Sequence, residues 1–249
     1  MSLTNVNSQH GVTTLTLTRG KVNAMNEEMV DQLLGTFHRL SADTDTRALI
    51  LTGQGSFFSF GLDVPELYGY SPPDFTRFLT KFTDLYRNMF EFPKPLIAAI
   101  NGHAVAGGFM IATPCDYRVM ATGKAKISLN EITFGSAVFA GSLEILKCVT
   151  GHRNAETIAL GGKMYSAEEA RALGLIDEAY APEAVLPRAQ AVATELAARD
   201  AVAYATDKKL LRGPITEQIR RSEADSIRRF VEIWYSPSTR EKTKRIVIR

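Results

Sequence analysis

Two short stretches place glycines directly between an apolar run and the start of a helical segment. In SFFSFGLDVPEL, Gly61 precedes Leu62; in NGHAVAGGFMIATPCDYRV, Gly107 and Gly108 precede an apolar helical segment. Glycine permits tight or left-handed turns and close backbone approach, and the first N–H groups of a helix lack partners within it. Each turn alone is explained by tight turning and close packing. Together they can offer two backbone N–H groups to one oxygen, as an oxyanion hole.

A single carboxylate is the candidate acid or base. Glu131, in KISLNEITFG, has apolar neighbours, and partial burial among them raises the pKa of a carboxyl above about 4.3. A surface glutamate or a helix cap is the alternative interpretation. Asp63 and Asp116 compete for the same role but are better interpreted as structural carboxylates that accept hydrogen bonds from loop and strand-end amides.

Other common chemistries lack their motifs. Gly53 and Gly55 follow a strand-like run, but the third glycine of a dinucleotide-binding loop is missing. The four histidines are scattered. Neither Cys115 nor Cys148 belongs to a CxxC pair or lies near histidines at metal-ligand spacing. We expect both cysteines to be small buried residues, and we predict no metal and no redox cofactor.

The composition is that of an ordinary globular protein of 249 residues with a formal net charge of +2. Such balanced charge gives no strong electrostatic case for nucleic acid or membrane as the main partner. The N-terminal stretch MSLTNVNSQHG lacks the basic start and apolar core of a signal peptide, and no apolar run approaches bilayer-spanning length. We therefore expect a cytoplasmic protein.

The elements that must position these residues alternate between strands and helices in the first half of the chain. Asn26 can cap one helix, and a second spans Asp74 to Phe90 with an aromatic stripe that is best explained by core packing. Helices that alternate with strands in this way indicate an α/β fold. Apolar and β-branched runs predict strands at 12–18, 48–52, 95–100, 117–121 and 126–129.

The C-terminal third is predicted to be mostly helical. Ser166 and Glu169 can form a capping box ahead of a short helix that stops near Gly174. From Glu183 the pattern is helical through Tyr235. Basic residues crowd the tail TREKTKRIVIR, which is either a solvated surface or a contact for a phosphate-bearing ligand or a neighbouring subunit.

Five ordered motifs resemble the crotonase superfamily, also called the enoyl-CoA hydratase/isomerase family: GKVNAMN, FFSFGLDVPEL, PLIAAINGHAVAGGFMIATPCDYRV, KISLNEITFG and GLIDEAY. The resemblance runs from Val12 to about Pro182 and continues weakly beyond. It implies an α/β spiral of ββα units over residues 1–190 that carries an acyl-CoA site. A helical region at 191–249 is implied to serve oligomerisation, as a homotrimer or a hexamer.

The resemblance also implies roles for particular residues. The backbone N–H groups of Leu62 and Gly107 correspond to the family's oxyanion hole for the thioester oxygen. The segment from Lys21 to Met25 corresponds to the loop that borders the adenine and pantetheine of coenzyme A, which arrives as part of the substrate. The implied contacts to substrate or coenzyme A are Lys21, Val22, Ala24, Phe60, Gly61, Asp63 and Gly108.

Hydratases of this family carry two catalytic glutamates, and the resemblance places Met110 and Glu131 at the corresponding positions. A thioether cannot act as an acid or base, whereas one carboxylate suffices to shift a double bond by moving a proton. The motifs are therefore most similar to Δ3,Δ2-enoyl-CoA isomerases. Alternatives are a hydratase or another crotonase-type lyase or hydrolase and, from a different class, a non-catalytic acyl-CoA-binding or RNA-associating relative. Phe60 stands where the family commonly has a small residue, which is expected to alter the mouth of the acyl-CoA site. The stretch from Gly135 to Ser142 replaces the glycine-rich loop of the hydratases, which leaves the length and branching of the acyl chain open.

Overall fold

Two layers of strands organise the chain, which this computed structural model describes from residue 3 to residue 246. The larger sheet has the strand order β1-β2-β3-β5-β7-β9, and the smaller has the order β4-β6-β8. The pairing is parallel in both sheets except between β1 and β2. The strands are β1 Thr4–Gln9, β2 Val12–Leu17, β3 Ala48–Gly53, β4 Phe57–Ser59, β5 Leu96–Ile100, β6 His103–Val105, β7 Tyr117–Ala121, β8 Ile127–Ser128 and β9 Glu178–Tyr180.

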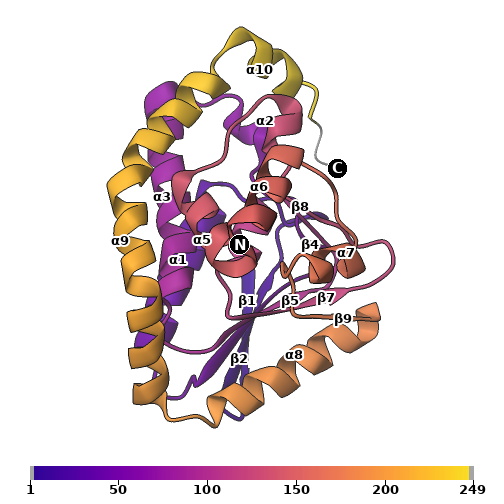
Figure 1. Ribbon diagram of the computed structural model, residues 1–249, viewed down its shortest axis with the longest axis vertical. Helices are drawn as coiled ribbons and strands as arrows, with labels where there is room; N and C mark the ends of the chain where they lie inside the picture. Colours follow the sequence, from indigo (N-terminus) through magenta and orange to yellow (C-terminus); the bar gives the residue numbers. More distant parts are fainter. Residues whose placement is uncertain (1–2, 247–249) are drawn as a thin grey trace.

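Successive strands alternate between the two sheets. From β3 to β8, each odd-numbered strand joins the larger sheet and the next even-numbered strand joins the smaller one. The chain therefore advances as a spiral of strand pairs with helices between them (Figure 1). This arrangement confirms the predicted α/β spiral with a helical C-terminal region.

The helices begin where the sequence supplies caps. The side chain of Asn26 accepts a hydrogen bond from Met29 N at 3.1 Å, and Ser166 with Glu169 forms the predicted capping box. The helices are α1 Glu27–Ala42, α2 Val64–Leu67, α3 Pro72–Glu91, α4 Gly107–Ala112, the 3-10 turn η1 Glu131–Phe134, α5 Ala140–Thr150, α6 His152–Gly161, α7 Ala167–Ala172, α8 Pro182–Ala197, α9 Ala201–Trp234 and α10 Pro237–Thr243.

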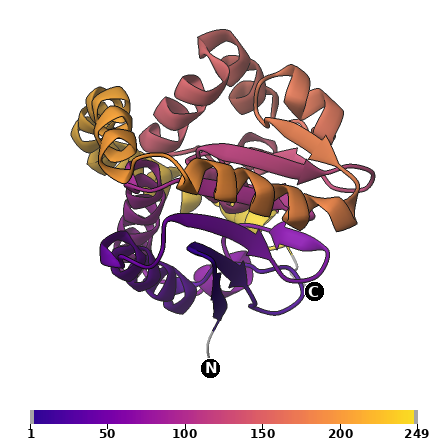
Figure 2. The same ribbon diagram turned by 90° about the horizontal axis from the view of Figure 1, so that it is seen from below.

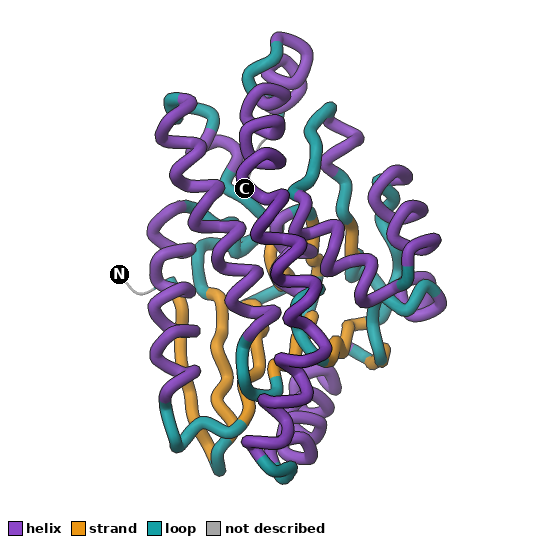
Figure 3. Tube along the Cα trace, turned by 60° about the vertical axis from the view of Figure 1, so that its left-hand side comes forward, coloured by secondary structure: helices purple, strands orange, loops and turns teal. Residues whose placement is uncertain are grey.

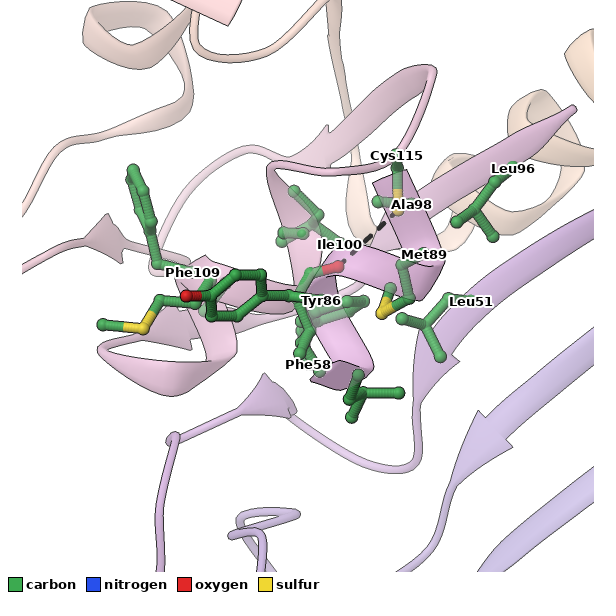
Figure 4. Close-up of a cluster of buried hydrophobic side chains, with 14 of the residues drawn as sticks. Leu51, Phe58, Tyr86, Met89, Leu96, Ala98, Ile100, Phe109 and Cys115 are labelled. Atoms are coloured by element: carbon green, nitrogen blue, oxygen red, sulfur yellow. Dashed lines mark hydrogen bonds between the residues drawn. The ribbon is translucent and has the colours of Figure 1, made fainter. Parts of the chain in front are cut away.

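Helices cover both sides of this framework. α8 lies across β3, β5 and β7 of the larger sheet, as seen from below in Figure 2. α1, α3 and the long α9 run side by side, with α3 between the other two (Figure 3). Part of the core appears in Figure 4, where Leu51 and Ile100 from strands meet Tyr86 and Met89 from α3. The aromatic stripe of α3 is thus core, as predicted.

The two cysteines differ in burial, and the predicted domain boundary falls within a helix. Cys115 is buried, but Cys148 is exposed, so its predicted burial is wrong. α5 buries Ile145 and Leu146, whereas Cys148 lies in the last turn of the helix, beyond its buried residues. Residue 190, the predicted domain boundary, lies inside α8, which packs on the larger sheet; the division into a core and an oligomerisation region stays a prediction.

The C-terminal tail is only partly described. Its first residues form α10, whereas residues 247–249 of the predicted basic tail lie outside the described chain. Between residues 3 and 246, no helix has both the length and the apolar character that crossing a bilayer requires.

Candidate active site

The first glycine turn follows β4 and is shaped by Gly61. This residue has a φ of +97°, in the region that side chains disfavour. A Cβ at this position would lie 2.7 Å from Gly107 N and 2.8 Å from Val105 O. Glycine is therefore required twice here, for its backbone conformation and for the close approach of the second turn.

The backbone of this turn directs the N–H of Leu62 away from the neighbouring segment at Met25. Met25 N donates to Gly61 O at 2.7 Å, and Asp63 N donates to Met25 O at 2.9 Å, which makes a parallel bridge between Met25 and Leu62. In such a bridge the flanking groups face Met25, so the N–H of Leu62 itself faces the other side. Within residues 3–246 no backbone carbonyl accepts a hydrogen bond from it.

The second turn starts α4 from a strained residue. Ala106 has φ 51° and ψ −119°, which is rare for a residue with a side chain. Its N–H donates to Ser128 O at 2.8 Å, and its carbonyl accepts from Met110 N at 3.1 Å. Gly107 is the first residue of α4, so its N–H has no partner inside the helix. A Cβ on Gly108 would lie only 2.1 Å from Ser59 O, so glycine is also required there.

The two free N–H groups border one space. A Cβ added to Gly107 would lie 3.2 Å from Leu62 N, about the distance at which an oxygen accepts a hydrogen bond. Both residues also line the same cavity, of about 210 Å³. The geometry is suited to two backbone donors acting on one oxygen, which is what an oxyanion hole requires.

Glu131 faces this cavity from the start of η1. Its side chain lines the cavity, yet the residue is only 4% exposed, and its Oε2 has no hydrogen-bond partner among the described residues. Burial raises the pKa of the Glu131 carboxyl from its ordinary 4.5 to about 8. The carboxyl is thus more deeply buried than the sequence predicted, and a raised pKa makes its ionised form a stronger base.

The rest of the cavity lining is almost entirely apolar. Among its described residues Glu131 is the only ionisable one, and the side chain of Asn130 is the other strongly polar group. Met110 also lines this cavity, to which it contributes a thioether and no acid. The full lining is Phe60, Leu62, Val64, Val105, Ala106, Gly107, Met110, Asn130, Glu131, Phe134, Phe139, Phe230, Trp234 and Ile246.

The segment from Lys21 to Met25 lies beside the first turn. Phe60 N donates to Val22 O at 2.9 Å, and Ser59 Oγ donates to Asn23 O at 2.8 Å. Val22 and Ala24 are buried, whereas Lys21 is exposed. The structure thus places this segment against the first glycine turn, and its contacts with coenzyme A remain predictions.

The competing carboxylates have structural partners. Asp63 caps α2 through Glu66 N at 3.2 Å and pairs with Arg19 at 2.6 Å. Asp116 pairs with Lys208 and Arg212, both at 2.7 Å. Neither aspartate lines the cavity. Their interpretation as structural carboxylates is confirmed, and the suggested contact of Asp63 with coenzyme A is untested.

Several cavity residues were not identified from the sequence. Phe230 and Trp234 come from α9, far along the chain, and Phe139 precedes α5. Their sequence signal is only a helical apolar pattern, which is equally typical of core residues. The positive φ of Ala106 could not be predicted from the sequence, because alanine rarely adopts this conformation.

Comparison with known proteins agrees with this geometry. Residues 7–244 match the family model described as enoyl-CoA hydratase/isomerase. The chain belongs to this family. Enoyl-CoA delta isomerase 1, mitochondrial, of Mus musculus is 31% identical over 218 residues, which are 86% of this chain and 75% of that protein. The 2,3-dehydroadipyl-CoA hydratase of Escherichia coli is 31% identical over 209 residues, 83% of this chain and 80% of that one.

Among solved structures, human mitochondrial delta3-delta2-enoyl-CoA isomerase superposes with a TM-score of 0.94 at 26% identity, covering 98% of this chain and 96% of that chain. The protein is therefore a crotonase-type enzyme of the enoyl-CoA hydratase/isomerase family, for which an acyl-CoA is the fitting substrate. Because relatives of similar identity include both isomerases and hydratases, the family does not determine the reaction.

Proposed function

We propose that the enzyme moves the 3,4 double bond of an enoyl-CoA to the 2,3 position. The observation that carries this proposal is a cavity lined by one buried carboxyl, Glu131, and by the thioether of Met110, with no other ionisable group in its described lining. Hydration in this family uses two carboxylates, whereas a double-bond shift needs one. A chain that had lost this carboxyl would favour a non-catalytic relative, but Glu131 is present and buried.

The proposed reaction is a proton transfer within one allylic system. Ionised Glu131 removes a proton from C2, and the electron pair of that C–H bond becomes part of a thioester enolate. The N–H groups of Leu62 and Gly107 stabilise the enolate oxygen, each contributing about 3 kcal/mol to barrier lowering as typical oxyanion donors do. The same carboxyl then returns the proton to C4, which leaves the double bond conjugated with the thioester.

The raised pKa of Glu131 suits this task. A general base works best when its pKa is near the working pH, because it is then both available and strong. With a pKa of about 8, about a tenth of the carboxyl is ionised at pH 7. The apolar lining favours the neutral carboxyl in the empty site and gives the ionised form a strong tendency to take up a proton.

The test compares two substrates. We expect trans-3-hexenoyl-CoA to give a rise in the absorbance of the conjugated thioester, and crotonyl-CoA to be consumed at least about a hundredfold more slowly, since one acid–base group is typically worth 10²–10⁴ in rate. Rapid loss of crotonyl-CoA absorbance, together with no reaction of the 3-enoyl substrate, would replace this proposal with hydration.

Coenzyme A is proposed to enter only as part of the substrate, with no further cofactor. The resemblance places its contacts at Lys21, Val22 and Ala24 and at the turn around Gly61. A homotrimer or hexamer and a cytoplasmic location are likewise proposed from the sequence.

A further inference from the structure

Three aromatic side chains form a layered wall on one side of the cavity. Phe230 and Trp234 lie one turn apart on α9, and Phe139 precedes α5. The rings of Phe139 and Phe230 stack with centroids 4.5 Å apart, and those of Phe230 and Trp234 stack at 6.2 Å. The three rings thus form one continuous apolar surface, which we call the aromatic wall.

A second layer of aromatic residues supports this wall. The ring centroid of Phe75 in α3 lies 4.8 Å from that of Trp234, and the ring centroid of Phe82 in the same helix lies 6.2 Å from that of Phe139. Both are fully buried. Trp234 Nε1 has no hydrogen-bond partner among the described residues, so close packing alone holds the indole in place. Protein interiors are packed at crystal-like density, and the wall therefore has no empty space behind it into which it can retreat.

The cavity volume sets how much acyl chain fits in front of the wall. A water molecule occupies about 30 Å³ in the liquid, and a methylene is of similar size. A cavity of about 210 Å³ therefore accommodates about seven non-hydrogen atoms. One is the thioester oxygen at the Leu62 and Gly107 donors, which leaves room for about six carbons.

We infer that the aromatic wall, and Phe230 in particular, limits the acyl group to a plain hydrocarbon chain of about six carbons. This inference rests on the proposed function only in placing the thioester oxygen at the two N–H donors. The polar groups of the lining, Glu131, Asn130 and the two N–H donors, are accounted for at the reacting end or beside it. The remaining lining is apolar, and it favours a chain without charged or polar substituents.

The first measurement is the binding of saturated acyl-CoAs, which needs no turnover. Titration calorimetry with acetyl- to hexadecanoyl-CoA, below micelle-forming concentrations, gives a dissociation constant for each chain length. Each buried methylene is expected to tighten binding about fourfold up to hexanoyl-CoA. Beyond octanoyl-CoA we expect no further gain or a loss. A steady gain in affinity through hexadecanoyl-CoA would overturn the inference.

Substitutions at Phe230 move the wall in both directions. Phe230→Leu removes about one methylene of volume, so it is expected to move the break in the series, the chain length at which affinity stops improving, about one carbon longer. Phe230→Trp adds volume and is expected to shift it to shorter chains. If both variants keep their circular dichroism spectra and both leave the break at the parent length, the wall does not set the limit.

The matched control is Phe37→Leu. Phe37 of α1 is likewise buried, but its ring packs against Phe92 and it does not line the cavity. This variant is expected to melt at a lower temperature while keeping the parental break. A shift equal to that of Phe230→Leu would assign the effect to general loosening of the core and contradict the inference.

The same series separates this inference from the proposed reaction. If 3-enoyl-CoAs of every length are inert but the binding series still breaks near six to eight carbons, the isomerase proposal fails and the length limit stands. If short 3-enoyl-CoAs react while binding keeps improving with length, the isomerase proposal stands and the length limit fails.

Discussion

The oxyanion turns and the Glu131 segment face the same cavity, but they are held in different ways. Around Leu62, the neighbouring groups Gly61 O and Asp63 N are both hydrogen bonded to Met25, and the turn is fixed on two sides. Around Glu131, two buried oxygens, Glu131 Oε2 and Asn130 Oδ1, have no partner among the described residues. In the half of the site around Leu62, the backbone on both sides of the donor is hydrogen bonded; the half around Glu131 keeps two buried polar atoms unpaired among the described residues.

The difference follows from what each half must do. The donors act by being in place before charge develops, so a rigid backbone frame serves them. The base acts by changing its own protonation, and unpaired burial is what raises its pKa. Leaving a buried polar atom unpaired costs about 1–3 kcal/mol, and such costs are typical of functional sites.

The C-terminal helix α10 supports the side of the site that contains Glu131. Thr239 Oγ1 of α10 donates to Gly135 O at 2.7 Å, just after η1, and Arg240 Nη1 donates to Tyr68 O at 3.0 Å, just after α2. α10 therefore links the chain that follows Glu131 to the chain that follows the first oxyanion turn (Figure 1). The two halves are thus tied together through the helical region as well as directly, by the hydrogen bond from Ala106 N to Ser128 O.

The largest expected effect comes from removing the base while keeping its shape. Glu131→Gln should lower turnover of trans-3-hexenoyl-CoA by about 10²–10⁴, the usual contribution of a general acid–base group. The dissociation constant of hexanoyl-CoA should change little, because an amide fills the same space. Steady-state rates and calorimetry measure the two quantities. Near-normal turnover in the variant would show that another residue is the base.

Removing one backbone donor should have the next largest effect. Leu62→Pro deletes an N–H that bonds no backbone carbonyl of the described chain, so the substitution breaks no backbone hydrogen bond of the frame. We expect a loss of about 10²–10³ in kcat. Leu62→Ala keeps the N–H and should be mild, which makes it the matched control.

Circular dichroism and the melting temperature must first show that the proline variant is folded. A folded Leu62→Pro enzyme as active as Leu62→Ala would mean that Leu62 N–H does not stabilise the enolate. The half of the site around Leu62 would then not act as a rigid hydrogen-bond donor, and its contrast with the half around Glu131 would be wrong.

The sequence predicted the half of the site that local conformation determines. Gly61 and Gly108 are required by steric rules that act within a few residues or at one close approach, so their pattern is visible in the chain. Strands β2, β3, β5, β7 and β8 were also predicted. β2 shows alternating and β-branched residues, and the others are the short apolar runs typical of buried parallel strands. β1 was missed, since it is an edge strand whose side chains are mostly polar and exposed.

What the sequence did not reveal depends on long-range packing. Phe230 and Trp234 look like ordinary core residues of a helix until α9 is placed against α3 and α5. The depth of Glu131 is also a tertiary property: its neighbours along the chain predicted partial burial, and full burial comes from the elements that close the cavity. Ala106 shows the same limit, because its strained backbone is imposed by the hydrogen bonds around it.

The smallest expected effect tests that burial through the pH dependence. If ionised Glu131 is the base, kcat/KM should rise about tenfold per pH unit below about pH 8 and level off above it, in line with a pKa of about 8. Between about pH 6 and 8 the total change is about fiftyfold, because a carboxyl with a pKa of about 8 is half ionised at pH 8. A carboxyl that is only partly buried would instead place this limb between about pH 4 and 7. A rate profile flat from about pH 6 to 9 would contradict a buried titrating base.

The same burial makes a prediction about stability, with Glu131→Gln as the control. A carboxyl whose pKa is raised from 4.5 to about 8 on folding keeps a proton that the unfolded chain releases between these values. The free energy of unfolding should therefore fall as the pH rises, by about 1.4 kcal/mol per unit between roughly pH 5 and 8. Glu131→Gln lacks this titration, so the variant should match the parent near pH 5 and exceed it near pH 9. Urea unfolding of both proteins at one protein concentration measures the difference. A constant difference across this range would mean that Glu131 titrates alike in the folded and unfolded chain, and the unpaired burial that distinguishes the half around Glu131 would have no energetic consequence.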